Sequence, residues 1–111
     1  MTEPRLKTEI RVSAHLRRAQ GAGAFATIVR RGDPDAGAVA VKVYIARGDA
    51  RLYTQSRDMD GNAVWREPFE SDQQTEDMEE KIDAWLARET AIDPDLWIVE
   101  IEDREGRAFL D

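Results

Sequence analysis

Two arginine pairs are the residues of this sequence best suited to hold an anion. Arg17 and Arg18 are adjacent, and Arg30 and Arg31 form a second adjacent pair. A guanidinium group presents several N–H donors in a planar fork, which matches the oxygens of a phosphate or a carboxylate. If the segments that carry the two pairs pack together, the four side chains form one anion-binding patch, with nucleic acid as one ligand. The alternative is that they pair with acidic residues of the same chain.

A second candidate is Lys42, which ends the run Val-Ala-Val-Lys and comes after a glycine-containing segment at 21–25. This order resembles the phosphate-covering loop and the lysine strand of protein kinases. The chain has neither the His-Arg-Asp loop nor the Asp-Phe-Gly site that phosphoryl transfer requires there, and 111 residues are too few for that fold. The glycines are therefore interpreted as the end of a helix, and no cofactor is expected.

The remaining chemistry rests on one histidine and on carboxylates. His15 is the single histidine and the chain has no cysteine, which nearly excludes a structural zinc site, so His15 is predicted to be a surface or boundary residue. Asp-Pro-Asp occurs at 33–35 and again at 93–95, and such carboxylates can ligate hard cations. We interpret both as turns, and predict neither a metal nor a catalytic residue. A small carboxylate-dependent enzyme stays an alternative.

The segment 25–54 organises the predicted fold, because it contains three β-type runs separated by two turns. The first strand, 25–31, is apolar on both sides and is predicted to be central in the sheet. The second alternates strictly, and Gly48-Asp49 then closes a hairpin. One inner face is predicted to hold Val39, Val41, Val43 and Ile45, continued by Ala50, Leu52 and Thr54.

The flanking segments supply the helices and the other strands. We predict a strand at 6–12, Ser13 as an N-cap and a short helix at 14–20, with one continuous helix over 6–20 as the alternative. A capping box at 71–74 precedes a helix at 73–90, whose apolar stripe is Met78, Ile82, Trp85 and Leu86. Further strands are predicted at 63–67, 97–102 and 108–110. The expected fold is a single α+β domain, 1–111, with a mostly antiparallel sheet of about five strands and two helices packed on one face.

Charge is divided unevenly along the chain. Residues 1–57 carry 11 Lys and Arg against 5 Asp and Glu, a net +6, and residues 58–111 carry 5 against 18, a net −13. Such a division suits docking to a charged partner, although the two halves can also neutralise each other in the fold. No apolar run approaches the ~20 residues that span a bilayer, so no membrane association is expected. The absence of cysteine and of a secretion signal predicts a cytoplasmic location.

Several stretches resemble one family over nearly the whole chain. They are Arg5-Leu-Lys-Thr-Glu-Ile, Val29-Arg-Arg-Gly-Asp, Asp93-Pro-Asp-Leu-Trp97 and Glu102-Asp-Arg-Glu-Gly-Arg-Ala-Phe-Leu110. These are similar to a family of small bacterial proteins catalogued as domain of unknown function fourteen-ninety-one. The resemblance implies a bacterial, cytoplasmic single domain. It implies no catalytic residue, because the family has no assigned activity.

The sequence favours a non-enzymatic cytoplasmic interaction module with an unidentified protein partner. It contains no catalytic constellation, no cofactor loop and no thiol, and its divided charge suits a charged partner. Anion or nucleic-acid binding through the two arginine pairs is the second hypothesis, and the carboxylate enzyme is the third. The oligomeric state is left open.

Overall fold

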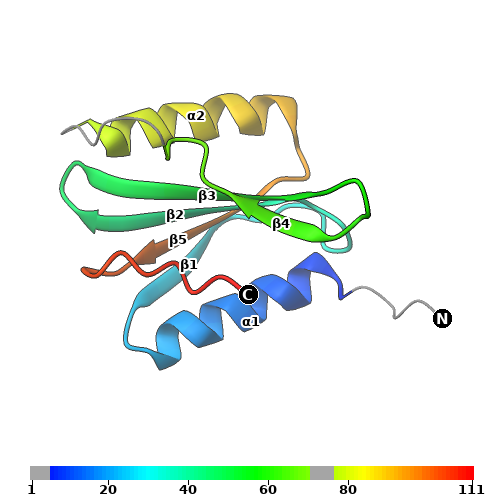
Figure 1. Ribbon diagram of the computed structural model, residues 1–111, viewed down its shortest axis with the longest axis horizontal. Coiled ribbons are helices and arrows are strands. Elements are labelled where there is room, and N and C mark those ends of the chain that lie inside the picture. The colour runs from blue at the N-terminus through cyan, green and yellow to red at the C-terminus, as the bar shows by residue number, and fades with distance from the viewer. Residues whose placement is uncertain (1–5, 71–76) are drawn as a thin grey trace.

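The computed structural model describes residues 6–70 and 77–111, which form a sheet between two helices (Figure 1). In chain order the elements are α1 (Thr8–Gly21), β1 (Phe25–Arg30), β2 (Val39–Ala46), β3 (Asp49–Arg57), β4 (Ala63–Arg66), α2 (Met78–Ile92) and β5 (Trp97–Glu102). The five strands lie in the order β1-β5-β2-β3-β4. Their pairings are antiparallel except that between β2 and β5, which is parallel. The predicted α+β fold with a mostly antiparallel sheet is confirmed.

The two helices lie on opposite faces of the sheet, so the prediction that both pack on one face is wrong (Figure 1). Val12 and Ala19 of α1 pack against Val41 of β2, whereas Ile82 of α2 packs in a second cluster that contains Ala40 of the same strand. Strand β2 is buried on both sides over its first five residues. A strand that carries apolar side chains on both faces has to be covered on both faces.

The hairpin turns β3 so that its apolar residues face α2. Residues directly opposite each other in neighbouring strands share a face, and Leu52 is opposite Lys42 while Arg51 is opposite Val43. Ala50 and Leu52 therefore lie on the α2 face, not on the predicted inner face of Val43. The register shift at the hairpin, between Tyr44 and Ala46, accounts for the error, since a slip of one residue exchanges the two faces of a strand.

The first segment is one continuous helix, so the alternative interpretation of 6–20 is confirmed and the strand at 6–12 is wrong. Val12, His15 and Ala19 are buried at spacings of three and four, and Ser13 is an exposed residue within the helix. The sequence 6–12 alternates as a strand would, but two residues of its apolar side, Leu6 and Ile10, are exposed.

Strand β1 lies at an edge of the sheet, not at its centre, because β5 inserts between it and β2. No strand forms at 108–110, although Ala108, Phe109 and Leu110 pack against the α1 side of the core. The predicted stripe of α2 is confirmed, with Trp85 half-buried at its margin. The predicted capping box and the first residues of the predicted helix at 73–90 lie outside the described residues.

Candidate functional site

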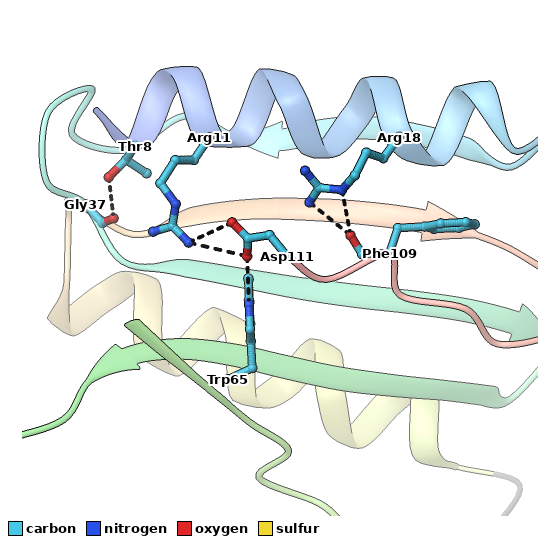
Figure 2. Close-up of polar contacts among 7 residues, drawn as sticks. All are labelled: Thr8, Arg11, Arg18, Gly37, Trp65, Phe109 and Asp111. Carbon is cyan, nitrogen blue, oxygen red and sulfur yellow. Dashed lines mark hydrogen bonds and ion pairs between the residues drawn. The ribbon is translucent and has the colours of Figure 1, made fainter. Parts of the chain in front are cut away.

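The first arginine pair lies on α1, near its C-terminal end. Arg17 is exposed to solvent. Arg18 donates from Nε and Nη2 to the carbonyl oxygen of Phe109, at 3.2 and 3.0 Å (Figure 2). This arginine therefore holds the C-terminal segment against α1, and its donors are already partly used by the chain itself.

The second pair lies at the end of β1 and is also engaged within the chain. Arg30 Nη1 donates to the carbonyl oxygens of Pro94, at 3.0 Å, and Leu96, at 2.6 Å. The guanidinium of Arg31 lies over the ring of Trp97, 5.4 Å from its centroid. Both arginines thus hold β1 to the turn that enters β5.

The structure does not bring the two pairs together. Arg17 and Arg18 lie near the end of α1, close to where β1 begins, and Arg30 lies at the far end of that strand. Five residue steps along a strand span roughly 17 Å. Arg30 also lines a hollow beside α2, on the opposite face of the sheet from α1. A single patch of four arginines is not formed in this arrangement.

Lys42 is buried on the α2 face among three carboxylates. Its Nζ lies 2.8 Å from Asp83, 3.2 Å from Glu100 and 3.3 Å from Glu79. Burial alone would lower the pKa of Lys42, but the hydrogen bonds to Asp83 and Glu100 outweigh it, so the pKa is raised. The lysine is therefore held charged, which suits an ion-pair network that joins α2 to the sheet.

The two Asp-Pro-Asp turns lie against each other. The backbone N–H of Asp33 donates to the carbonyl oxygen of Asp95 at 3.0 Å. Their carboxylates are used locally, since Asp33 accepts from the N–H of Ala36 and Asp93 accepts from that of Asp95. Within residues 6–70 and 77–111, no group of three or more His, Cys, Asp or Glu side chains is arranged to hold a metal ion.

His15 is buried beneath the C-terminal segment, so the prediction of a surface or boundary residue is wrong. Its Nε2 lies 2.7 Å from the carbonyl oxygen of Ala108 and must donate the proton, since a carbonyl only accepts. Next to it, Asp111 accepts from Arg11 at 3.1 Å and from Trp65 Nε1 at 3.0 Å (Figure 2). These polar contacts hold the C-terminal segment over the α1 side of the core.

The stability of the protein should fall between about pH 7.5 and 5.5, because His15 is buried in its neutral form. Burial, and then the charges of Arg18 and Arg11, lower the pKa of His15, against the Ala108 carbonyl and Asp111, which raise it. The unfolded chain takes up the proton first as the pH falls below about 6.5, which favours unfolding. Urea unfolding across this range measures the effect.

The control is the His15→Gln variant, which keeps a donor for the Ala108 carbonyl but has no titrating ring. Its stability should change less with pH over the same range than that of the wild type. Equal pH dependence in the two proteins would show that His15 is not its source.

On the α2 side, part of the sheet is left uncovered. We define the open face as Phe25, Thr27 and Val29 of β1 together with Glu100 and Glu102 of β5. Phe25 is 76% exposed and Val29 is 58% exposed. On this face, helix α2 packs mainly over β3, which is three strands away from β1 in the sheet. The described residues thus leave two large apolar side chains in solvent beside a helix.

The strand register explains why these side chains share one face. Phe25 is opposite Glu102 and Thr27 is opposite Glu100, while Ala26 and Ile28 point to the α1 side. A bulge follows, so that both Val29 and Arg30 line the hollow beside α2.

Two adjoining hollows lie along the open face, and Glu100 lines both of them. The one nearer α2 has a volume of about 400 Å³ and is bordered by Val29, Arg30, Lys42, Asp83, Leu86, Ala87, Thr90, Ile98 and Glu100. The other, of about 350 Å³, is bordered by Phe25, Ala26, Thr27, Glu100 and Glu102. Glu100 is the border residue that the two hollows share, and the hollow nearer α2 is bounded on one side by that helix.

The open face was missed from the sequence for an identifiable reason. Apolar residues on both sides of 25–31 are typical of a central strand, which is covered on both faces. Phe25 and Val29 are large β-formers on an edge strand, and their exposure depends on which strands α2 covers. A sequence signal for this face is the alternation of acidic Glu100 and Glu102 in a later strand, since Phe25 is opposite Glu102 and Thr27 is opposite Glu100.

The fold and the open face define a small α+β protein with one helix on each side of a five-stranded sheet. The chain belongs to the DUF1491 family of proteins of unknown function, whose model matches residues 6–111. The resemblance seen in the sequence is thereby confirmed.

Solved structures of bacterial proteins share this fold. A DUF1491 family protein from Caulobacter crescentus CB15, solved by crystallography, is 47% identical, with 96% of this chain and 95% of that chain covered and a TM-score of 0.82. An NMR structure of a DUF1491 family protein from the same organism is 45% identical, over 97% and 94%, with a TM-score of 0.83. Protein Atu0922 from A. tumefaciens is 33% identical, over 96% and 93%, with a TM-score of 0.76.

Comparison with curated proteins finds no match. None of the helices in the described part of the chain is long and apolar enough to cross a membrane.

Proposed function

We propose that this protein is a non-enzymatic cytoplasmic interaction module, and that it binds a partner protein on the open face. The observation that carries the proposal is that Phe25 and Val29 are both exposed, and that each of them borders one of two adjoining hollows along β5. Large apolar side chains gathered beside a depression are typical of protein interaction sites. Aromatic residues such as Phe25 are enriched at the centres of such interfaces.

The other two hypotheses have less support. The two arginine pairs lie near opposite ends of β1, and three of the four side chains contact carbonyls or a ring of the chain itself. The carboxylates of Asp33 and Asp93 cap backbone N–H groups, which leaves them fewer free lone pairs for chemistry.

Affinity purification of the tagged protein from its native cells tests the proposal. The wild type should recover a partner in stoichiometric amount, and a Phe25→Ser, Val29→Ser double variant should lose it. Both side chains are exposed, so the double variant should fold with a stability close to that of the wild type.

The matched control is Met59→Ser, which removes an exposed apolar side chain in the turn between β3 and β4, away from the open face. This variant should retain the partner. Recovery of a lone monomer by the wild type, or of the same partner by all three proteins, would contradict the proposal.

A further inference from the structure

Resting on the proposed function, we infer that the occupant of the open face is a helix of a partner protein that carries lysine or arginine between two apolar side chains. The open face supplies an aromatic anchor at Phe25, an aliphatic one at Val29 and the carboxylates of Glu100 and Glu102 between and beside them. This occupant fits the width of the uncovered part of the sheet and the irregular register of β1. It also fits the negative charge of the open face and the spacing of Phe25 and Val29.

The uncovered part of the sheet has the width of one helix. Neighbouring strands lie about 4.8 Å apart, so five strands span roughly 20 Å, and an α-helix with its side chains is about 10 Å across. Because α2 packs mainly over β3 and also buries Ile98 of β5, the part left beside it is β1 with Glu100 and Glu102 of β5. A helix from a partner would lie alongside α2 and complete a layer of two helices on this face.

A strand added to the free edge of β1 fits less well. Edge addition needs a regular ladder of backbone N–H and C=O groups. The register of β1 shifts between Ile28 and Arg30, and a bulge of this kind disrupts the ladder and protects an edge from further pairing. The side chains of the open face are therefore a better contact surface than the edge itself.

Charge selects a basic partner. Around the open face, four carboxylates face two cations, an excess of two negative charges, where the carboxylates are Glu79, Asp83, Glu100 and Glu102 and the cations are Lys42 and Arg30. Lys42 lies against three of the four acids, and Glu102 is exposed, with Phe25 opposite it in β1 and Tyr44 opposite it in β2. A lysine or arginine of the partner helix would reach Glu100, which is opposite Thr27 between the two anchors, and Glu102, which is opposite Phe25.

The anchor spacing sets the spacing in the partner. Phe25 and Val29 are four residues apart on a strand, which is roughly 13 Å. A helix rises 1.5 Å per residue, so the matching apolar side chains lie about seven or eight residues apart. Basic residues three or four positions after the first of them then fall on the same helical face, near Glu100.

A displayed library of single helices tests the inference on the whole folded protein. Each helix is about 16 residues long, with Leu or Ser at the two anchor positions and Lys or Glu at the two positions between them. Selection on the wild type should enrich Leu at both anchors and Lys between them. Binding of the selected peptide should weaken about tenfold or more in the Glu102→Lys variant, because like charges then face each other.

The control is Asp60→Lys, the same charge reversal at an exposed position of the β3–β4 turn, which should leave binding unchanged. Amide shifts in an NMR titration with the selected peptide should fall on β1, β5 and α2. Enrichment of Glu-bearing helices, absence of any enrichment, or a binding loss equal in both variants would overturn the inference.

The outcomes also separate this inference from the proposed function. If a native partner is lost with the Phe25→Ser, Val29→Ser variant but the library shows no preference for Lys, the open face binds a protein of another kind and only the inference fails. A dimer in sedimentation that the Phe25→Ser, Val29→Ser variant no longer forms would overturn the inference in the same way. If no native partner depends on the open face, the proposed function itself fails.

Discussion

Replacing Gly32 by alanine should destabilise the protein by about 3 kcal/mol and lower its melting temperature by roughly 10 °C or more. A Cβ atom at this position would run into the backbone of Asp95 and Leu96, which cannot rotate away as a side chain can. The contact lies where the turn after β1 crosses the turn before β5. The same crossing binds Trp97, whose Nε1 donates to the carbonyl oxygen of Asp33 at 2.7 Å. Thermal and urea unfolding measure the loss.

Gly21→Ala is the matched control for this substitution. Gly21 is the last residue of α1, and a Cβ atom there would meet nothing within 4 Å. Alanine should be neutral or stabilise by up to about 1 kcal/mol, because it restricts the unfolded chain. A similar loss of stability in both variants would show that the crossing of the two turns is not the cause.

Replacing Lys42 by methionine should cost about 2 kcal/mol. The substitution removes the cation that faces Glu79, Asp83 and Glu100, and leaves three carboxylates to repel one another. Breaking a fully buried ion pair costs about 3–5 kcal/mol, and the expected loss is smaller here because the carboxylates are 29–54% exposed. Urea unfolding at neutral pH gives the difference.

The pH dependence of the Lys42→Met variant identifies the mechanism. Lowering the pH weakens the repulsion among the three acids of the folded variant, so the deficit against the wild type should shrink between about pH 7 and 4.5. A double variant, Lys42→Met with Glu100→Gln, should recover part of the loss at neutral pH. A deficit that is constant with pH and unaffected by Glu100→Gln would instead indicate poor packing of methionine.

Local sequence patterns were sufficient to predict the strands between residues 25 and 54 and the apolar stripe of α2. Val39 to Ile45 alternate so regularly that only a strand fits, and Met78, Ile82 and Leu86 have helical spacing. At 6–12 two periods fit the same residues, because Leu6 and Ile10 are apolar yet exposed. The pattern alone could not show which apolar side chains find a partner.

Strand order and the open face could not be predicted, because they depend on contacts between distant segments. The insertion of β5 between β1 and β2 moves β1 to the edge and exposes Phe25. Likewise His15 is buried because residues 108–111 return across α1, where its Nε2 lies near the Ala108 carbonyl, and because Trp65 of β4 packs against its ring. Neither the insertion of β5 nor the return of residues 108–111 can be predicted from the residues that are near Phe25 or His15 in the sequence.

The position of β5 also has a consequence for how the chain folds as it is synthesised. Strands β2, β3 and β4 pair with their neighbours in sequence and can form a meander as soon as they emerge from the ribosome. Strand β1 has to wait for β5, which begins 67 residues after Arg30. During that interval the buried edge of β2 and the whole of β1 lack partners. The nascent chain should therefore depend most on chaperones until Trp97 to Glu102 have emerged from the ribosome and paired.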